Sequence, residues 1–313
     1  MSYNAVTLVQ PSLLGGLDVL PSVDGMPTFA APTRDTAKRN SLDVSDLVEY
    51  ARQATSVCNR YPIYIISKGR WETRKTSKAL DRLSVNYKIV VEPSEAMQYA
   101  KVIDPDKILV LPGNFSEKGE GSIPVRNWVW DHSLNAGFTR HWVLDDNLDG
   151  FGIQSGGRRV NTSSNADFLA ITEDFADKYS NVAIAGIRYR FHHNYVRDPY
   201  ILNTRIYSCI LVRNDIPFRW RGRYNEDTDL SLRVLKAGYA TALMTWCYCN
   251  KAATLTMKGG NEEIYAESNN RFEFAQSLVD QHPDVAKVVE KYGRYHHLVD
   301  YRPFRSNPLE VGA

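Results

Sequence analysis

The sequence predicts an α/β fold with a mostly parallel sheet flanked by helices. Between residues 61 and 150, short apolar runs typical of strands alternate with segments of helical periodicity, which is the pattern of βαβ units. Several of the expected strands end in polar loops, and the carboxyl ends of parallel strands form the ligand-binding edge of such sheets. Apolar residues make up 43% of the 313 residues, which supplies a core and excludes a disordered chain or a disulfide-stapled scaffold.

The first half of the chain contains the clearest alternation. In chain order we expect a strand at 63–66, a helix at 76–83, a strand at 87–91, a helix at 94–100, a strand at 107–111, a helix at 125–135 and a strand at 141–144. The first, second and fourth of these strands run into Ser67 to Arg70, Glu92-Pro93 and Asp145 to Asn147. We expect these three polar loops to converge at one edge of the sheet.

The second half is less regular. We expect strands at 181–187, 206–213 and 240–249, and helices at 228–236, 263–278 and 285–292. A helix is also expected at 41–55, after a segment rich in Pro, Gly, Ser, Thr and Ala. The chain therefore divides into an N-terminal arm and helix at 1–58, a central domain at 59–265 and a C-terminal helical extension at 266–313.

Charge and cysteine content restrict the class of protein. Lys and Arg number 38 against 36 Asp and Glu, so the overall charge indicates no partner. The four cysteines are scattered and form no zinc pattern, which favours a reducing compartment. No run reaches the roughly 18 to 20 apolar residues of a membrane span, and no signal peptide is recognisable, so we expect a cytoplasmic protein without a membrane partner. P-loop, GxGxxG and GxSxG motifs are absent, which disfavours kinase-like NTPases, nicotinamide enzymes and α/β-hydrolases.

Two carboxylates and an amide, Asp145, Asp146 and Asn147, follow the fourth expected strand. Such oxygens at a strand end can hold a divalent cation, and the cation can neutralise a diphosphate. Asp and Asn are also common in ordinary turns, which is the simpler interpretation of this motif alone. The preceding strand and the motifs below favour the cation.

A second group of acids, Glu226, Asp227 and Asp229, lies at the start of an expected amphipathic helix. An acidic N-terminus is favoured by the helix dipole, and this explains part of the pattern without any function. It does not explain why Arg219, Arg221 and Arg223 stand just before the acids.

The segment 188–223 contains eight arginines, no lysine and only two acids, with tyrosines and histidines interleaved. Guanidinium groups fork onto phosphates, and aromatic rings stack on unpaired bases. A solvated, salt-bridged face is the alternative. For a polyanion we expect contacts from Arg188, Arg190, Arg219, Arg221, Arg223 and, beside Gly259-Gly260, Lys258.

Read in order, the motifs carry a family resemblance. Ser67-Lys68-Gly69-Arg70, Glu92-Pro93, Arg126-Asn127, Trp142 to Asn147 and Asn225 to Asp229 together resemble the GT-A class of nucleotide-sugar glycosyltransferases. The chain is more specifically similar to the TET-associated glycosyltransferases of bacteriophages. That family is proposed to sugar-modify hydroxymethylated pyrimidines in phage DNA. The resemblance implies a GT-A-like, Rossmann-type nucleotide-sugar-binding sheet, with 59–265 as the catalytic domain.

The resemblance also implies roles for individual residues. Nucleotide-sugar binding would fall to Ser67, Arg70, Glu92, Arg126 and Asp145. A divalent metal, Mn²⁺ or Mg²⁺, would be held by Asp145, Asp146 and Asn147, with Asn147 standing where the family has its last acid. Asp227, with Glu226 as the alternative, would be the catalytic base of an inverting enzyme.

The expected reaction is transfer of a sugar from a nucleotide-sugar, a UDP-sugar in our expectation, to a modified base in phage DNA. The base expected is 5-hydroxymethylcytosine, and the arginine-rich segment would hold the DNA. If the protein is phage-encoded, the reaction takes place in the host cytoplasm. A polysaccharide or protein acceptor is one alternative. A catalytically inactive DNA-binding module is another, against which the presence of both acid clusters argues.

Overall fold

The computed structural model describes residues 59–119, 121–155, 158–161, 167–190, 198–251, 271–291 and 293–312. The helix expected at 41–55, the first part of the helix expected at 263–278, and Lys258 lie outside these ranges. Within the described ranges, none of the helices has the length and apolar character needed to cross a bilayer.

The first half forms a parallel sheet, as predicted. Its elements are β1 (Ile63–Ile66), α2 (Lys75–Arg82), β2 (Lys88–Val91), η3 (Pro93–Glu95), α3 (Ala96–Ala100), η4 (Pro105–Lys107), β3 (Ile108–Val110), η5 (Phe115–Lys118), α4 (Ile123–Asn135) and β4 (Arg140–Asp145). The strands pair in the order β3-β2-β1-β4, and every pair is parallel. The polar loops that end β1, β2 and β4 therefore lie at one edge.

The second half extends this sheet with strands of both directions. Its elements are β5 (Leu148–Ser155), β6 (Arg158–Asn161), α5 (Asp167–Lys178), β7 (Val182–Tyr189), β8 (Tyr200–Leu202), β9 (Cys209–Arg213), α6 (Glu226–Lys236) and β10 (Ala240–Lys251). The described strands make a ten-stranded sheet of order β3-β2-β1-β4-β9-β7-β10-β5-β6, and β8 pairs with β10. Strands β9, β8 and β5 run against the others, so the sheet is mostly parallel, and the α/β class is confirmed.

The antiparallel strand β9 matters most for the site. It lies between β4 and β7, so its first residues stand at the edge where those two strands end. Asp145 N donates to Ser208 O at 2.8 Å across this point. Strand β10 runs parallel to β7, and its last residue, Lys251, reaches the same edge.

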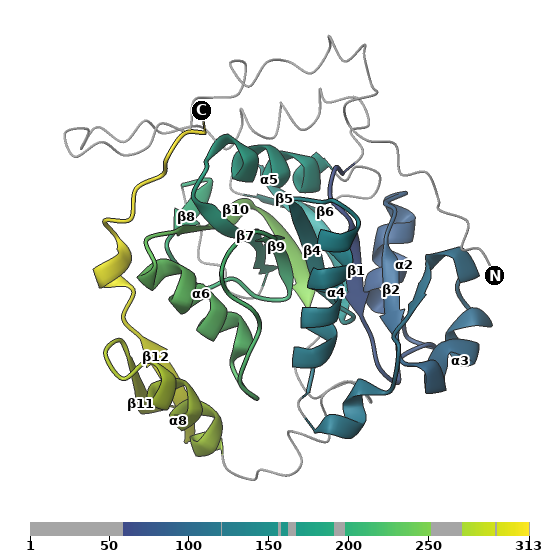
Figure 1. Ribbon diagram of the computed structural model, residues 1–313. Helices are drawn as coiled ribbons and strands as arrows, with labels where there is room; N and C mark the ends of the chain where they lie inside the picture. The colour runs from purple at the N-terminus through teal and green to yellow at the C-terminus, as the bar shows by residue number, and fades with distance from the viewer. Residues whose placement is uncertain are drawn as a thin grey trace.

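Helices cover both faces of the sheet. On one face α4 and α6 lie in front of the strands (Figure 1), where Trp130 and Leu230 pack with Ile210 in one apolar cluster. On the other face α2 and α5 contribute Leu80 and Phe168 to the largest cluster. Each such fully buried side chain contributes about 1.5–3 kcal/mol relative to an exposed one. Packing on both faces holds the strand ends in fixed positions.

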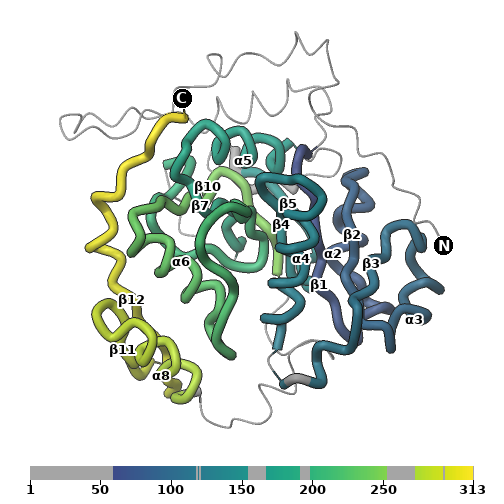
Figure 2. The backbone as a smooth tube through the Cα atoms, in the orientation of Figure 1, coloured from purple at the N-terminus to yellow at the C-terminus, as the bar shows by residue number. Residues whose placement is uncertain are grey.

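The C-terminal part differs from the prediction. It contains α8 (Arg271–Gln281), β11 (Ala286–Lys291), β12 (Arg294–Val299) and η7 (Arg302–Phe304). The helix predicted at 285–292 is wrong, because Ala286–Lys291 is a strand paired antiparallel with β12. β-Branched Val288 and Val289 favour a strand, and Gly293, at φ 68°, supplies the left-handed conformation of the hairpin turn. The final segment returns toward α5 (Figure 2), where Ser180 N donates to Glu310 O at 2.7 Å.

Gly186 in β7 permits the close approach of the loop that leads into β9. A Cβ atom at this position would lie 2.5 Å from Cys209 O and would overlap Ile206 Cγ2. The obstacle is partly backbone, so it cannot rotate away. Glycine is therefore required where the loop crosses the strand.

We predict that Gly186→Ala destabilises the protein by about 1–3 kcal/mol, the usual cost of overpacking a filled core. Gly113→Ala is the matched control, because a Cβ there meets nothing within 4 Å. Urea unfolding measures both. Equal unfolding midpoints for the two variants would contradict the close-approach argument.

Candidate active site

A buried arginine, Arg126, lies at the centre of the acidic residues. Its side chain is 5% exposed, and its guanidinium lies over the Trp220 ring, 4.7 Å from the centroid. Nη2 lies 3.2 Å from Asp145 Oδ1, Nε 3.7 Å from Glu226 Oε1 and Nη1 3.4 Å from Asp227 Oδ1. One cation therefore joins the two acidic motifs, which are far apart in the sequence.

The local structure explains how these groups meet. Arg126 lies in the first turns of α4, whereas Asp145 is the last residue of β4. Helix α6 begins at Glu226, after Asn225 in the left-handed conformation at φ 58°. The Asn225 side chain donates to Phe274 O at 2.5 Å, which anchors the turn. Both Glu226 and Asp227 then lie in the first turn of α6, where the helix dipole favours negative charge.

Asp227 has the properties of a proton acceptor. Burial is the largest effect on its pKa, Arg126 opposes it, and Glu226 and Asp145 add to it, so that the pKa is raised to about 7. Asp227 Oδ1 has no hydrogen-bond partner among the described residues. Its contact with Arg126 Nη1 at 3.4 Å is an ion pair without a hydrogen bond. A carboxylate with a pKa near neutrality and an oxygen that accepts no hydrogen bond suits general-base chemistry.

Asp145 is held in the ionised form. Burial alone would raise its pKa, but Lys251, Arg126 and the Ser208 hydroxyl outweigh burial and lower the pKa to about 2. Lys251 Nζ lies 2.9 Å from Asp145 Oδ2, and the Ser208 hydroxyl donates to the same oxygen. Asp145 therefore stays negatively charged at neutral pH.

Asp146 points into the first polar loop. Arg70 Nη1 pairs with its Oδ1, and the Ser67 hydroxyl donates to its Oδ2 at 2.9 Å. Burial raises the pKa of Asp146, although Arg70 acts in the opposite direction. Tyr99 OH supports the loop, because it lies 2.6 Å from Ser67 Oγ and accepts Arg70 N at 3.2 Å. The predicted convergence of the β1 and β4 loops is thus present in the structure.

Glu92 has a different environment. It is buried after β2, and its two carboxylate oxygens accept Ser116 N at 2.6 Å and the Ser116 hydroxyl at 2.7 Å. These bonds tie η5 to the sheet edge. A nucleotide-binding role for Glu92 stays a prediction.

The carboxylates expected to bind a metal are already engaged by groups of this chain. All four oxygens of Asp145 and Asp146 accept hydrogen bonds from side chains of this chain. Asn147 Oδ1 is buried without a partner among the described residues, but a single amide oxygen is a poor site. No group of three His, Cys, Asp or Glu side chains within the described ranges has a metal-binding arrangement. As arranged, these residues do not fit a divalent cation, and its binding stays an expectation of the resemblance.

The structure gives Arg221 a partner inside the fold. Arg221 Nη2 lies 3.0 Å from Asp229 Oδ1, and the Asp229 side chain is 0% exposed. Arg233 Nε and His282 Nε2 also contact Asp229, at 2.8 and 2.9 Å. This network anchors α6 to α8. The Arg221 side chain is 50% exposed, and its contact with DNA stays a prediction.

Three of the other predicted DNA-binding arginines lie against aromatic rings. Arg219 is 4.7 Å from the Trp130 centroid, with Nη2 3.6 Å from Asp131 Oδ1, a loose pair between half-exposed side chains. Arg223 lies over Tyr224 at 5.5 Å and Arg190 over Tyr248 at 6.0 Å. Their contact with DNA stays a prediction, and Lys258 lies outside the described residues.

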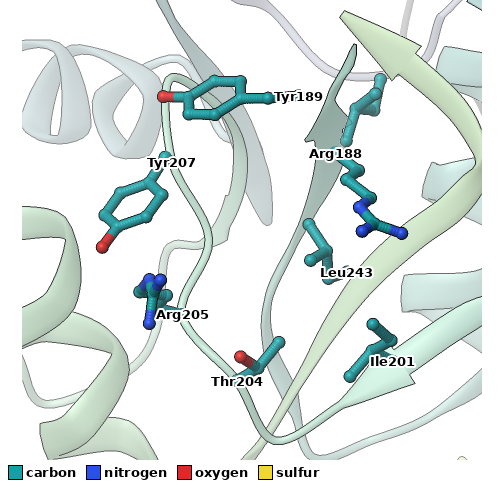
Figure 3. A pocket seen from close by; sticks show the side chains of 8 residues that line it. Arg188, Tyr189, Ile201, Thr204, Arg205, Tyr207 and Leu243 are labelled. Carbon is teal, nitrogen blue, oxygen red and sulfur yellow. The ribbon is translucent and has the colours of Figure 1, made fainter. Parts of the chain in front are cut away.

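A cavity of about 250 Å³ lies beside the acidic cluster, and Figure 3 shows Arg188 and Arg205 on opposite sides of it. Tyr189 and Tyr207 form another part of its wall, with parallel rings whose centroids are 6.1 Å apart. Tyr207 OH lies 3.1 Å from Thr228 Oγ1, the residue after Asp227. The cavity therefore borders the turn that carries the candidate base.

Sequence reasoning missed Lys251, Ser208 and Tyr189, which meet at Asp145. Lys251 lies two residues after the expected strand 240–249, and the rule that ligands meet the carboxyl ends of parallel strands could have identified it. Ser208 gave no such signal, because its place depends on the antiparallel direction of β9.

Comparison with known families gives one result for this chain. A family model described as TET-Associated Glycosyltransferase matches residues 61–260, which confirms the resemblance seen in the motifs. No curated protein matches the chain.

We predict that Arg221→Gln destabilises the protein by about 1–3 kcal/mol, because it leaves a buried carboxylate short of a partner. Arg219→Gln should cost about 0–1 kcal/mol, the usual range for an exposed pair. Urea unfolding of the two variants makes the comparison. The structural role of Arg221 is refuted if its variant unfolds at the same midpoint as the wild type.

Proposed function

The chain belongs to the TET-associated glycosyltransferase family, and on this premise we propose that it transfers a sugar from a UDP-sugar to the hydroxymethyl group of 5-hydroxymethylcytosine in DNA. The observation that carries the proposal is the cluster around Arg126. In this cluster a buried cation, suited to a diphosphate, lies beside the Asp227 carboxylate, whose pKa is raised to about 7. Both groups are needed for sugar transfer from a nucleotide.

The proposed step is a direct displacement at the anomeric carbon of the sugar. The acceptor hydroxyl oxygen forms a bond to that carbon while the bond from the carbon to the diphosphate oxygen breaks. The bonding electrons leave with the diphosphate, and the hydroxyl proton passes to Asp227. Attack opposite the leaving group inverts the anomeric configuration. Asp227 Oδ1, buried without a hydrogen-bond partner among the described residues, supports this assignment.

The donor would lie over the β1 and β4 loops. Arg70 and Arg126 come to this edge from different elements, and guanidinium groups suit the oxygens of a diphosphate. Arg126 is already fixed by Trp220 and three carboxylates, so it loses little freedom on binding. Preorganised charge of this kind stabilises the departing diphosphate in the transition state.

The acceptor would approach from the cavity side. Tyr189 and Tyr207 offer aromatic faces, and Arg188 and Arg205 offer positive charge, which are the contacts that an unstacked base and its phosphates use. The target base would leave the stack to reach Asp227, as bases do in other enzymes that modify them. The position of the cavity beside Thr228 supports this direction of approach.

Incubation with DNA containing 5-hydroxymethylcytosine and a panel of UDP-sugars tests the proposal. We expect mass spectrometry of the digested nucleosides to show the hydroxymethylated nucleoside with an added sugar, together with an equal amount of UDP. DNA of the same sequence with unmodified cytosine is the control and should gain nothing. Transfer only to a polysaccharide or protein would reject the DNA acceptor, and release of no nucleotide would indicate a binding module.

We predict that Asp227→Asn lowers kcat by about 10²- to 10⁴-fold, the usual contribution of a general base, and leaves UDP-sugar affinity almost unchanged. The amide keeps the shape of the side chain but cannot take the proton. In the wild type only the ionised carboxylate is active, so kcat should rise as pH increases through about 7. Glu226→Gln is the matched control: its kcat should still rise with pH, with a midpoint at lower pH because the charge of Glu226 raises the pKa of Asp227. A wild-type kcat that is flat or falls across this range would show that Asp227 is not the base.

A further inference from the structure

Lys251 is the one lysine found within the acidic cluster in the described part of the chain. Its ammonium contacts three oxygens: Asp145 Oδ2 at 2.9 Å, Ser208 Oγ at 2.8 Å and Tyr189 OH at 3.3 Å. An ammonium has three donors, so these contacts use all of them. The side chain is 23% exposed, which leaves the group within reach of a ligand.

The topology of the sheet places this ammonium at the edge where the nucleotide-sugar donor would bind. Lys251 ends β10, which runs parallel to β7 and pairs with β5 through Leu148, three residues after Asp145. It therefore arrives beside the motif that the family resemblance associates with a metal. The position of Lys251 follows from the backbone pairing of β10. It does not depend on a surface side chain folding inward.

The charges around Asp145 leave little need for another cation. Arg126 Nη2 contacts one of its oxygens, at 3.2 Å, and Lys251 Nζ contacts the other. At Asp146 the cation is Arg70. A divalent ion on these carboxylates would have to displace a resident cation and would meet the positive charge of the others, which raises its free energy. A diphosphate, in contrast, would find several positive groups already in place.

We infer that Lys251 is the countercharge of Asp145 and, if the proposed function holds, of the departing diphosphate, in the place where a divalent cation would otherwise be expected. Lys251 is then a catalytic residue that contacts the donor. When the sugar–oxygen bond breaks, negative charge grows on the diphosphate, and the ammonium can shift part of its interaction from Asp145 to the phosphate oxygens. Arg126 holds Asp145 ionised while this occurs.

Binding of nucleoside diphosphates, measured by calorimetry, tests this inference without requiring turnover. UDP, GDP and ADP are used as probes, each in the presence of EDTA and in the presence of Mn²⁺. The wild type should bind its preferred diphosphate with similar affinity in both conditions. Lys251→Met keeps the apolar stem but removes the charge. It should bind much more weakly in EDTA, and Mn²⁺ should restore part of the loss because Asp145 has lost its ammonium.

Two further variants control the experiment. Lys107→Met removes a lysine that pairs with Asp81 at 2.6 Å on the surface, and it should behave as the wild type. Lys251→Arg keeps the positive charge and should retain binding in EDTA. Thermal melts of all variants check folding. If Lys251→Met does not fold, the inference is decided by Lys251→Arg and by the wild type in the two conditions.

The inference is overturned if the wild type binds no diphosphate in EDTA and binds one in Mn²⁺, or if folded Lys251→Met binds as well as the wild type in EDTA. It is also overturned if none of the diphosphates binds in either condition.

Failure of the proposed function is a separate result. Metal-independent diphosphate binding that depends on Lys251, without transfer to hydroxymethylated DNA, would keep the lysine assignment and reject the acceptor. Transfer to hydroxymethylated DNA that requires Mn²⁺ in the wild type would keep the acceptor and reject the lysine assignment.

In a transfer assay, Lys251→Met should lower the rate in EDTA by about 10²- to 10³-fold, the usual cost of removing one group that stabilises an oxyanion.

Discussion

The site depends on one buried guanidinium, that of Arg126, which is shared among three carboxylates. A buried charge is tolerated only when opposite charges surround it closely. Burial alone would lower the pKa of Arg126, but Asp227, Glu226 and Asp145 outweigh burial and raise it. The three acids benefit unequally, because Asp145 has a second cation in Lys251. As a result Asp145 stays ionised, whereas at Asp227 burial outweighs Arg126 and raises the pKa to about 7. Two of the carboxylates around Arg126 therefore have different roles: Asp145 contributes a fixed negative charge, and Asp227 acts as the base.

The fold is arranged so that this sharing is possible. Asp145 comes from the end of β4 and Arg126 from the start of α4, while Asp227 comes from the first turn of α6. The antiparallel strand β9 brings Ser208 against Asp145, and the absence of a side chain at Gly186 lets the loop before β9 cross β7. Close packing on both sides of the sheet limits how far these strand ends can move.

Much of the fold could be predicted, because short apolar runs mark the first four strands and Gly137 ends the helix before the fourth. The loops at Ser67 to Arg70 and Asp145 to Asn147 could be brought together from the parallel-sheet rule alone. The strand at Ala286–Lys291 could not be predicted, because a stretch of six residues is too short for its pattern to distinguish a strand from a helix. Arg221 could not be assigned either, because its buried partner Asp229 is known only from tertiary packing. Lys251 differs from Arg221, because the parallel-sheet rule applied to the end of the strand predicted at 240–249 could have identified it.

Titration of the Asp227 carboxyl group by ¹³C NMR tests the central role of Arg126 most directly, with the resonance assigned from its loss in Asp227→Asn. The account predicts a pKa near 7 in the wild type. It also predicts a higher pKa in Arg126→Gln, because the cation that favours the ionised form has been removed. A wild-type pKa close to the ordinary aspartate value of about 3.9, or the same pKa in both proteins, would contradict the account.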